Sequence, residues 1–160
     1  MVIERDAAIL RCRAAVEACH EEGILLLART DARSSRGFDE AMARVKAFVA
    51  EGADILFLDS PQSEAEMREA VAACDGKPSL AVTSPAGRHF MPGNTELERI
   101  GIKIVVYPQE ILAATVHAVR SALTGLKGGS KPAMASPAEL ATAIRSADYL
   151  ARDARWPDPL

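Results

Sequence analysis

The stretch ILLLARTDARSSRGF, residues 24–38, decides the fold class. Its apolar run at residues 24–28 has the length of a strand and no polar interruption, which fits a strand covered on both faces, as in a parallel sheet. Directly before it, an apolar stripe predicts a helix over residues 3–22, and Gly23 is a typical C-terminal stop for that helix. Directly after it come Arg29, Thr30 and Asp31. A buried strand that ends on three polar side chains needs an explanation.

The same alternation repeats along the chain. Apolar runs of strand length begin near residues 24, 54, 78 and 102, and each is followed by apolar residues at helical spacing. This order predicts βαβ units with right-handed crossovers and a parallel sheet, so the fold class is α/β.

Two boundaries follow from composition. Residues 1–127 hold the repeated strands and helices, and residues 128–135 form a linker rich in Gly, Ser, Lys and Pro. Residues 136–160 form a C-terminal helical arm, because Ser136, Pro137 and Glu139 are typical of a helix start. The linker allows this arm to dock away from its own sheet, for instance on another subunit.

Composition excludes several classes of protein. The net charge is −3 and no basic cluster is present, so we expect no nucleic-acid partner. No apolar run approaches the roughly 20 residues that span a bilayer, and the charged N-terminus does not resemble a signal peptide. We therefore expect a cytoplasmic protein without membrane contact. Its three cysteines (Cys12, Cys19 and Cys74) are expected to be reduced, small core residues.

The first candidate site residue is Arg29, because ligands of parallel α/β folds bind at the carboxyl ends of the strands. A guanidinium there can hold a carboxylate or phosphonate through two parallel hydrogen bonds. The alternative is a surface pair between Arg29 and Asp31 beside a turn. Asp31 could also order Arg29 or cap the following segment, and Thr30 belongs to the same strand end.

The other strand ends add further candidates. Asp59 ends the second strand, where it could accept a hydrogen bond from substrate, bind a metal through water, or serve only the turn. Thr83 and Ser84 end the third strand, where their hydroxyls could hold substrate oxygens or cap the loop. His89 could act as an acid or base, although a solvated loop histidine is an ordinary alternative. No metal-binding or glycine-rich phosphate motif is present.

Four segments in order resemble the second half of the isocitrate lyase / phosphoenolpyruvate mutase superfamily. They are LLLARTDA, FDEAMARVKAFVAEGADILFLDSP, PSLAVTSPAG and ELERIGIKIVVYP, and the likeness covers roughly residues 5–127. The resemblance implies half of a (β/α)8 TIM-type barrel and a lyase or mutase that uses Mg²⁺. Such enzymes act on the C–C or C–P bond next to the carbonyl of a small α-oxo acid, and an oxo-acid decarboxylase is a further variant. It also implies that Arg29 clamps the substrate.

The chain departs from the family pattern in two ways. Asp59 stands where the lyases commonly carry Glu, and Val82 and Ser84 stand where they carry Asn and Thr. In addition, the first four strands, which carry the metal-binding carboxylates in the family, have no counterpart here. We therefore expect no metal ligand in this chain, apart from Asp59 acting through water.

Four strands cannot close an eight-stranded barrel, so both sheet edges are expected to be bare. The chain could be a truncated gene product, pair with a second copy as a homo-oligomer, join a complementary half-barrel chain, or persist as an open sheet. Two functions follow: an Mg²⁺-dependent enzyme, or part of one, and a catalytically inactive half-barrel that acts only in assembly.

Overall fold

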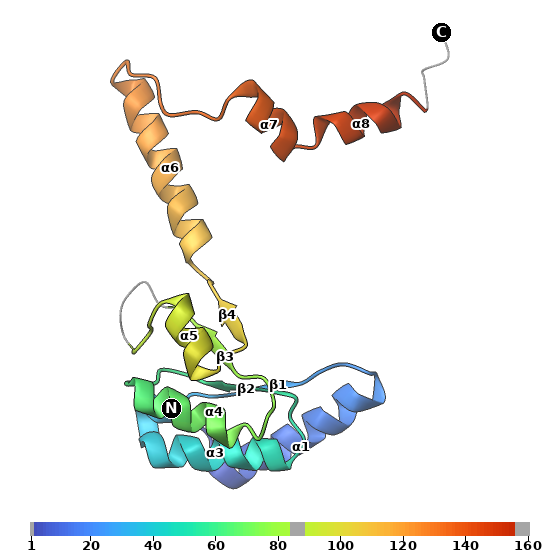
Figure 1. Cartoon of the computed structure of the whole chain (residues 1–160), viewed down its shortest axis with the longest axis vertical. Coiled ribbons are helices and arrows are strands. Elements are labelled where there is room, and N and C mark those ends of the chain that lie inside the picture. The colour runs from blue at the N-terminus through green and yellow to red at the C-terminus, as the bar shows by residue number, and fades with distance from the viewer. Residues whose placement is uncertain (1, 84–88, 156–160) are drawn as a thin grey trace. The chain divides into compact units, whose positions relative to one another are not determined.

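The computed structural model describes residues 2–83 and 89–155 (Figure 1). The predicted alternation of four strands with helices is present, with one additional short helix at residues 32–36 after the first strand. In chain order they are α1 (Arg5–Glu21), β1 (Leu27–Thr30), α2 (Ala32–Arg36), α3 (Phe38–Ala50), β2 (Ile55–Leu58), α4 (Glu64–Ala73), β3 (Leu80–Val82), α5 (Asn94–Ile100), β4 (Ile104–Val106), α6 (Glu110–Lys127), α7 (Pro137–Ala143) and α8 (Ser146–Asp153).

The chain divides into two compact units, Met1–Leu112 and Ala113–Leu160. The domain boundaries drawn from the sequence, at residues 127 and 136, stay predictions. In the second unit, Ser136 and Glu139 form the expected capping box at the start of α7. Helices α7 and α8 are separate because Arg145 adopts the left-handed backbone conformation between them. No helix within the described ranges is long and apolar enough to cross a membrane.

All strand pairs in the first unit are parallel, as predicted. Strand β1 pairs with β2, and β3 pairs with β4. A single bridge between Leu56 and Ser79 links the two pairs, supported by a 3.0 Å hydrogen bond from the Leu56 amide to the Pro78 carbonyl. The carboxyl ends of the neighbouring strands β1 and β2 therefore lie side by side, with Thr30 opposite Leu58.

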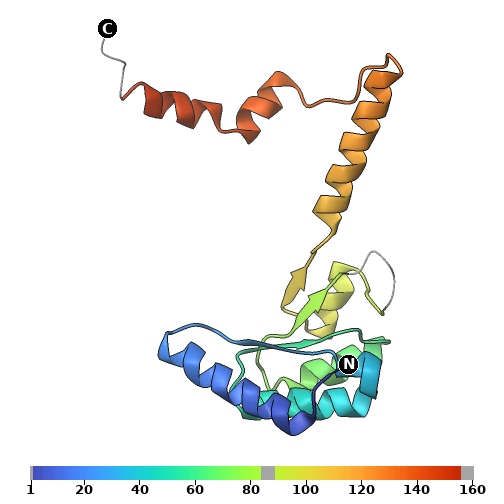
Figure 2. The same cartoon turned by 180° about the vertical axis from the view of Figure 1, so that it is seen from behind.

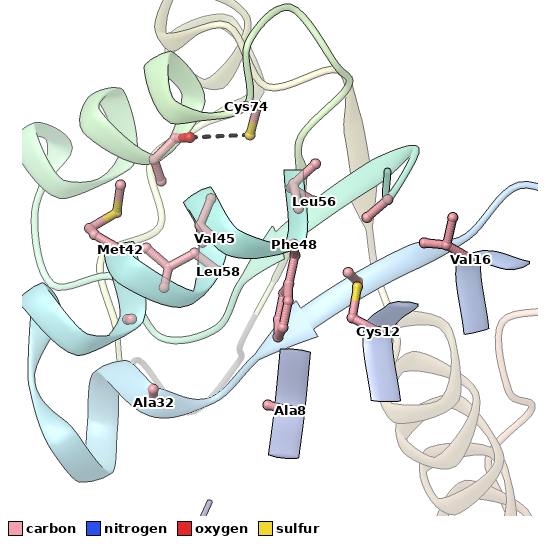
Figure 3. Close-up of a cluster of buried hydrophobic side chains, with 14 residues drawn as sticks. Ala8, Cys12, Val16, Ala32, Met42, Val45, Phe48, Leu56, Leu58 and Cys74 are labelled. Carbon is pink, nitrogen blue, oxygen red and sulfur yellow. Dashed lines mark hydrogen bonds between the residues drawn. The ribbon is translucent and has the colours of Figure 1, made fainter. Parts of the chain in front are cut away.

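The main core lies between the β1–β2 pair and the helices α1, α3 and α4, which all lie on the same side of it (Figures 1 and 2). Figure 3 shows Cys12 of α1, Phe48 of α3 and Leu56 of β2 converging there. A second cluster, built on Leu97 and Ile100, covers β3. Burial of this apolar surface is the main force that holds the helices on the strands.

Strand β1 differs from its prediction. Residues 24–26 precede the strand, and Ile24 and Leu25 are 58% and 70% exposed. Within β1 only Ala28 and Thr30 are buried, so the strand is covered on one face rather than on both. The prediction of two covered faces is wrong because helices pack on one face only.

Two of the three cysteines lie in the core as expected. Cys12 and Cys74 are buried, whereas Cys19 is partly exposed. Burial raises the pKa of the Cys74 thiol to about 11. A thiol with such a pKa is a poor nucleophile at neutral pH, which agrees with a packing role.

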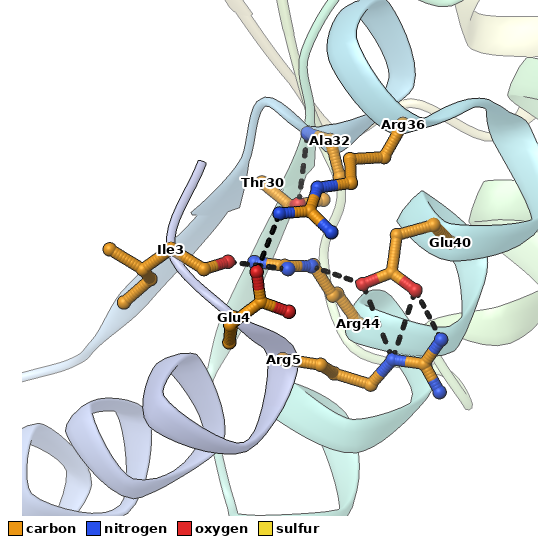
Figure 4. Close-up of polar contacts among 8 residues, drawn as sticks. All are labelled: Ile3, Glu4, Arg5, Thr30, Ala32, Arg36, Glu40 and Arg44. Carbon is orange, nitrogen blue, oxygen red and sulfur yellow. Dashed lines mark hydrogen bonds and ion pairs between the residues drawn. The ribbon is translucent and has the colours of Figure 1, made fainter. Parts of the chain in front are cut away.

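A charged network fastens the N-terminal segment to α3 (Figure 4). The buried Arg44 donates from Nε to Glu40 (2.8 Å) and from Nη2 to the Ile3 carbonyl (2.7 Å). Arg5 also pairs with Glu40, and Arg36 pairs with Glu4. Hydrogen bonds from Arg5 and then Arg44 lower the pKa of Glu40 from 4.5 to about 2.

The low pKa of Glu40 predicts that the folded protein loses stability in acid. Because the folded pKa of Glu40 lies below its unfolded value, its stabilisation is complete above pH 4.5 and is lost as the pH falls toward 2. We expect the urea midpoint to fall over this range. Glu40→Gln should lower the midpoint at about pH 7 and flatten its decline in acid. If the urea midpoint declined equally with falling pH in the wild type and in Glu40→Gln, Glu40 would not be the source of the acid sensitivity.

Candidate functional site

The candidate site lies at the carboxyl ends of β1 and β2 and is centred on Arg29. Its Nε donates to Asp31 Oδ1 (2.5 Å), and its Nη2 lies 3.0 Å from Asp59 Oδ1. The guanidinium also stacks over the Phe57 ring, 4.9 Å from the centroid. The register of the parallel pair sets Arg29 opposite Phe57, which explains how residues 28 positions apart meet. The structure thus brings together three of the predicted residues.

The electrostatics of this cluster combine one cation with two carboxylates. The hydrogen bond to Asp31 is the largest cause that raises the pKa of Arg29, and the charge of Asp59 adds to it. The Arg29 side chain is still half exposed. A guanidinium has five N–H groups, and these two contacts engage only Nε and Nη2. Arg29 therefore keeps N–H donors for an anionic ligand. The ion pair between Arg29 and Asp31, which was the alternative to ligand binding, is also present.

Asp59 is held on both oxygens. Arg29 approaches Oδ1, and the Ser60 hydroxyl donates to Oδ2 at 2.8 Å. Ser60 has a positive φ of 57°, a conformation that is unusual for a residue other than glycine and is found often at functional sites. The strand end is therefore a fixed turn that presents an already hydrogen-bonded carboxylate.

Thr30 does not join this cluster. It is 4% exposed and its hydroxyl accepts a 3.3 Å hydrogen bond from the Ala32 amide. Neighbouring residues in a strand point to opposite faces, so Arg29 and Thr30 diverge. The structure gives Thr30 a role in the turn to α2, and its predicted contact with substrate stays a prediction.

The third strand end holds a separate pair. The Thr83 hydroxyl donates to the Glu110 carboxylate and lies 3.3 Å from the Val106 carbonyl. This hydrogen bond is the largest cause that lowers the pKa of Glu110. The sequence reading did not single out Glu110, although its place just after the fourth strand was the available signal. Ser84 lies outside the described residues.

His89 is less exposed than the solvated loop residue that was the alternative. It is partly buried, and its Nε2 lies 3.1 Å from the Val82 carbonyl. A carbonyl oxygen only accepts, so Nε2 donates and carries the proton. The ring is thereby held against the end of β3.

The described residues do not fit a Mg²⁺ site by themselves. Within residues 2–83 and 89–155, no group of three or more His, Cys, Asp or Glu is arranged to hold a metal ion. The two carboxylates nearest the strand ends, Asp31 and Asp59, are both engaged by Arg29. In the described part of the chain, these carboxylates are therefore ion-paired with Arg29 and are not grouped around a position for a metal ion.

The fold and the site are those of parallel β/α proteins that carry polar groups at the carboxyl ends of their strands. Comparison with known proteins gives the family within this class. The family model described as phosphoenolpyruvate phosphomutase matches residues 1–127. The chain belongs to this family, the isocitrate lyase / phosphoenolpyruvate mutase superfamily, as the resemblance implied.

The relatives that the chain matches include proteins named as lyases. The chain is 33% identical over 126 residues to 2,3-dimethylmalate lyase of Eubacterium barkeri, which covers 79% of this chain and 43% of the relative. It is 29% identical over 154 residues to oxaloacetate decarboxylase of Rhodopseudomonas palustris, which covers 94% of this chain and 52% of the relative. The chain therefore spans about half the length of these relatives, or less.

Solved structures confirm the fold class. A crystal structure of 2,3-dimethylmalate lyase matches with a TM-score of 0.81 and 28% identity, over 98% of this chain and 57% of that one. Oxaloacetate acetylhydrolase in complex with 3,3-difluorooxalacetate matches with a TM-score of 0.83 and 28% identity, over 96% and 53%. These proteins are TIM-type barrels, so the prediction of consecutive βα units from such a barrel is confirmed.

Proposed function

We propose that this chain forms the substrate-binding wall of a lyase or mutase that acts on the C–C or C–P bond next to the carbonyl of a small α-oxo acid. The observation that carries the proposal is Arg29. It is half exposed at the carboxyl end of β1 and is oriented by Asp31 and Asp59. A guanidinium held in this way is pre-organised for a carboxylate, because little side-chain freedom is lost on binding.

The chemistry that the described residues support is binding and orientation. The remaining N–H groups of Arg29 would hold a substrate carboxylate or phosphonate through charge-assisted hydrogen bonds. Thr83, whose hydroxyl proton is directed at Glu110, would offer an oxygen lone pair rather than a donor. Any Mg²⁺ that takes part would need ligands beyond the described residues.

The names of the relatives narrow the substrates to be tested. Purified chain should be incubated with 2,3-dimethylmalate, 2-methylisocitrate and oxaloacetate, each with and without Mg²⁺. Release of pyruvate, followed by reduction with lactate dehydrogenase, reports on cleavage. We expect the chain to bind at least one of these acids, as measured by titration calorimetry, and we expect any turnover to require Mg²⁺ ligands from beyond the described residues. A chain that neither turns over nor binds any of them would contradict the proposal.

A second candidate is an inactive half-barrel that acts only in assembly. The observation that favours it is the double engagement of Arg29, because the two carboxylates already compensate its charge. The same experiment separates the two functions: binding or turnover of an oxo acid supports the first, and their joint absence supports the second.

A further inference from the structure

A second ion pair lies outside the Arg29 cluster and joins the segments that follow the same two strands. Arg33 belongs to α2, which follows β1, and Glu66 lies in the first turn of α4, which follows β2. The Arg33 guanidinium donates from Nε to Glu66 Oε2 (2.8 Å) and from Nη2 to Glu66 Oε1 (2.7 Å). Two parallel hydrogen bonds of this kind fix the orientation of both side chains. The Arg33–Glu66 pair therefore holds α2 against the start of α4.

This pair is shielded from water. The side chains of Arg33 and Glu66 are 23% and 16% exposed, whereas those of Arg29 and Asp31 are each 50% exposed. Partial burial strengthens the attraction between opposite charges, because fewer water molecules screen them. The hydrogen bond from Arg33 is the largest cause that lowers the pKa of Glu66, which is therefore ionised at neutral pH. The pair is thus a firmer tie than an exposed ion pair.

Glu66 also contacts the turn that carries Asp59. Its Oε2 accepts a 2.8 Å hydrogen bond from the Gln62 amide, and the Gln62 side chain donates to the Ser60 carbonyl at 3.0 Å. Ser60 in turn donates from its hydroxyl to Asp59. A path of hydrogen-bonded groups therefore runs from Glu66 to the carboxylate that contacts Arg29.

On the β1 side, Arg33 lies close behind Asp31 in the sequence. Asp31 directly precedes α2, and its side chain makes no capping hydrogen bond to the helix, so the carboxylate is directed at Arg29 instead. In the described part of the chain, two ion pairs join β1 and α2 to the end of β2 and to α4. One is made by Arg29 inside the site, and the other is the Arg33–Glu66 pair outside it.

A ligand at the site would change the balance between these two ties. A bound carboxylate competes with Asp31 and Asp59 for the one guanidinium of Arg29, so both of these contacts weaken. Arg29 then holds the two strand ends together less firmly. The Arg33–Glu66 pair does not depend on Arg29, and it keeps the two turns in place while Arg29 engages the ligand.

We propose that Arg33 and Glu66 are positioning residues of the anion site, which hold the Asp31 and Asp59 carboxylates in place while Arg29 exchanges its contacts with a ligand. This role rests on the proposed function, because it concerns how the same site binds an oxo-acid carboxylate. Arg33 and Glu66 do not touch the ligand. They act by pre-organisation, which reduces the freedom that the site loses on binding.

The first measurement needs no ligand. Arg29 Nε–H donates to Asp31, so its proton resonance and its exchange with solvent report the geometry of the cluster. The resonance is assigned by its loss in Arg29→Lys. In Arg33→Ala and in Glu66→Gln we expect the resonance to shift and its exchange to become at least about fivefold faster. An Arg29 signal that is unchanged in the folded variants would overturn the proposal, whether or not the chain binds oxalate.

The second measurement is oxalate affinity by titration calorimetry. Arg33→Ala should weaken binding about tenfold, a loss typical of residues that orient a binding group without touching the ligand. Arg33→Lys restores the charge and should recover part of the affinity. Glu66→Gln keeps an acceptor for the Gln62 amide and removes only the charge, so it replaces Arg33→Ala if that variant does not fold.

A matched control is available on α1. Arg13 forms a two-bond pair of the same geometry with Glu51, at 2.7 and 2.9 Å, away from the strand ends. Arg13→Ala should leave both the Arg29 resonance and the oxalate affinity unchanged. If Arg33→Ala bound oxalate as tightly as Arg13→Ala, the positioning role would be overturned and the Arg29 clamp would stand. If the wild type bound no oxalate, the proposed function would fail, and the Arg29 resonance would decide the positioning role.

Discussion

Arg29→Ala is expected to lower the affinity of the chain for oxalate at least about 100-fold. The substitution removes two charge-assisted hydrogen bonds to the ligand, each of which contributes about 1.5–3 kcal/mol. It also leaves Asp31 and Asp59 without the cation that lies between them, and their charges then repel an anion. Titration calorimetry with oxalate, a small dicarboxylate analogue of an oxo acid, measures this loss.

Two variants make this result specific. Arg29→Lys keeps the charge but loses the planar fork, so its affinity should lie between those of the wild type and Arg29→Ala. Arg13→Ala removes an exposed arginine that pairs with Glu51, away from the strand ends, and should bind oxalate normally. Unfolding curves check that each variant is folded. Oxalate affinity that is unchanged in folded Arg29→Ala would rule out the clamp.

Arg44→Ala is expected to cause the largest loss of stability, about 3 kcal/mol. The side chain is 3% exposed and joins Glu40 to the Ile3 carbonyl. Its removal leaves a cavity, leaves the Ile3 carbonyl without its hydrogen-bond donor, and leaves the Glu40 carboxylate with one partner fewer. A loss of this size is a large fraction of the stability of an ordinary domain, about 5–15 kcal/mol.

Urea unfolding measures this loss as a lower midpoint at an unchanged slope. Arg44→Lys should recover part of it, because the charge returns without the second hydrogen bond. Arg13→Ala again serves as the control, because exposed ion pairs contribute little to stability. If Arg44→Ala and Arg13→Ala unfolded at the same urea concentration, the network of Figure 4 would not hold the N-terminal segment in place.

The candidate site was predictable only in part. The rule that ligands meet the carboxyl ends of parallel strands selected Arg29, Asp31 and Asp59, which the structure does bring together. The same rule also selected Thr30, which the pleat of the strand turns into the core. Glu110 lies in the first turn of α6, where an acidic residue is common, and only the contact with Thr83 distinguishes it.

The sequence by itself determined the order of elements, the parallel sheet and the family. These depend on periodicity, turn residues and motif order, which are local along the chain. It also determined the helix start at Ser136, whose hydroxyl accepts a hydrogen bond from the Glu139 amide.

Only the tertiary structure decided which faces are covered and which charges meet. Strand β1 is bare on one side because the helices pack on the other, and Arg29 is compensated because the register places Asp59 beside it. Arg44 is buried because the N-terminal segment folds back over α3. Such contacts join residues that are distant in sequence, and their geometry depends on how the whole core packs, which no local pattern encodes.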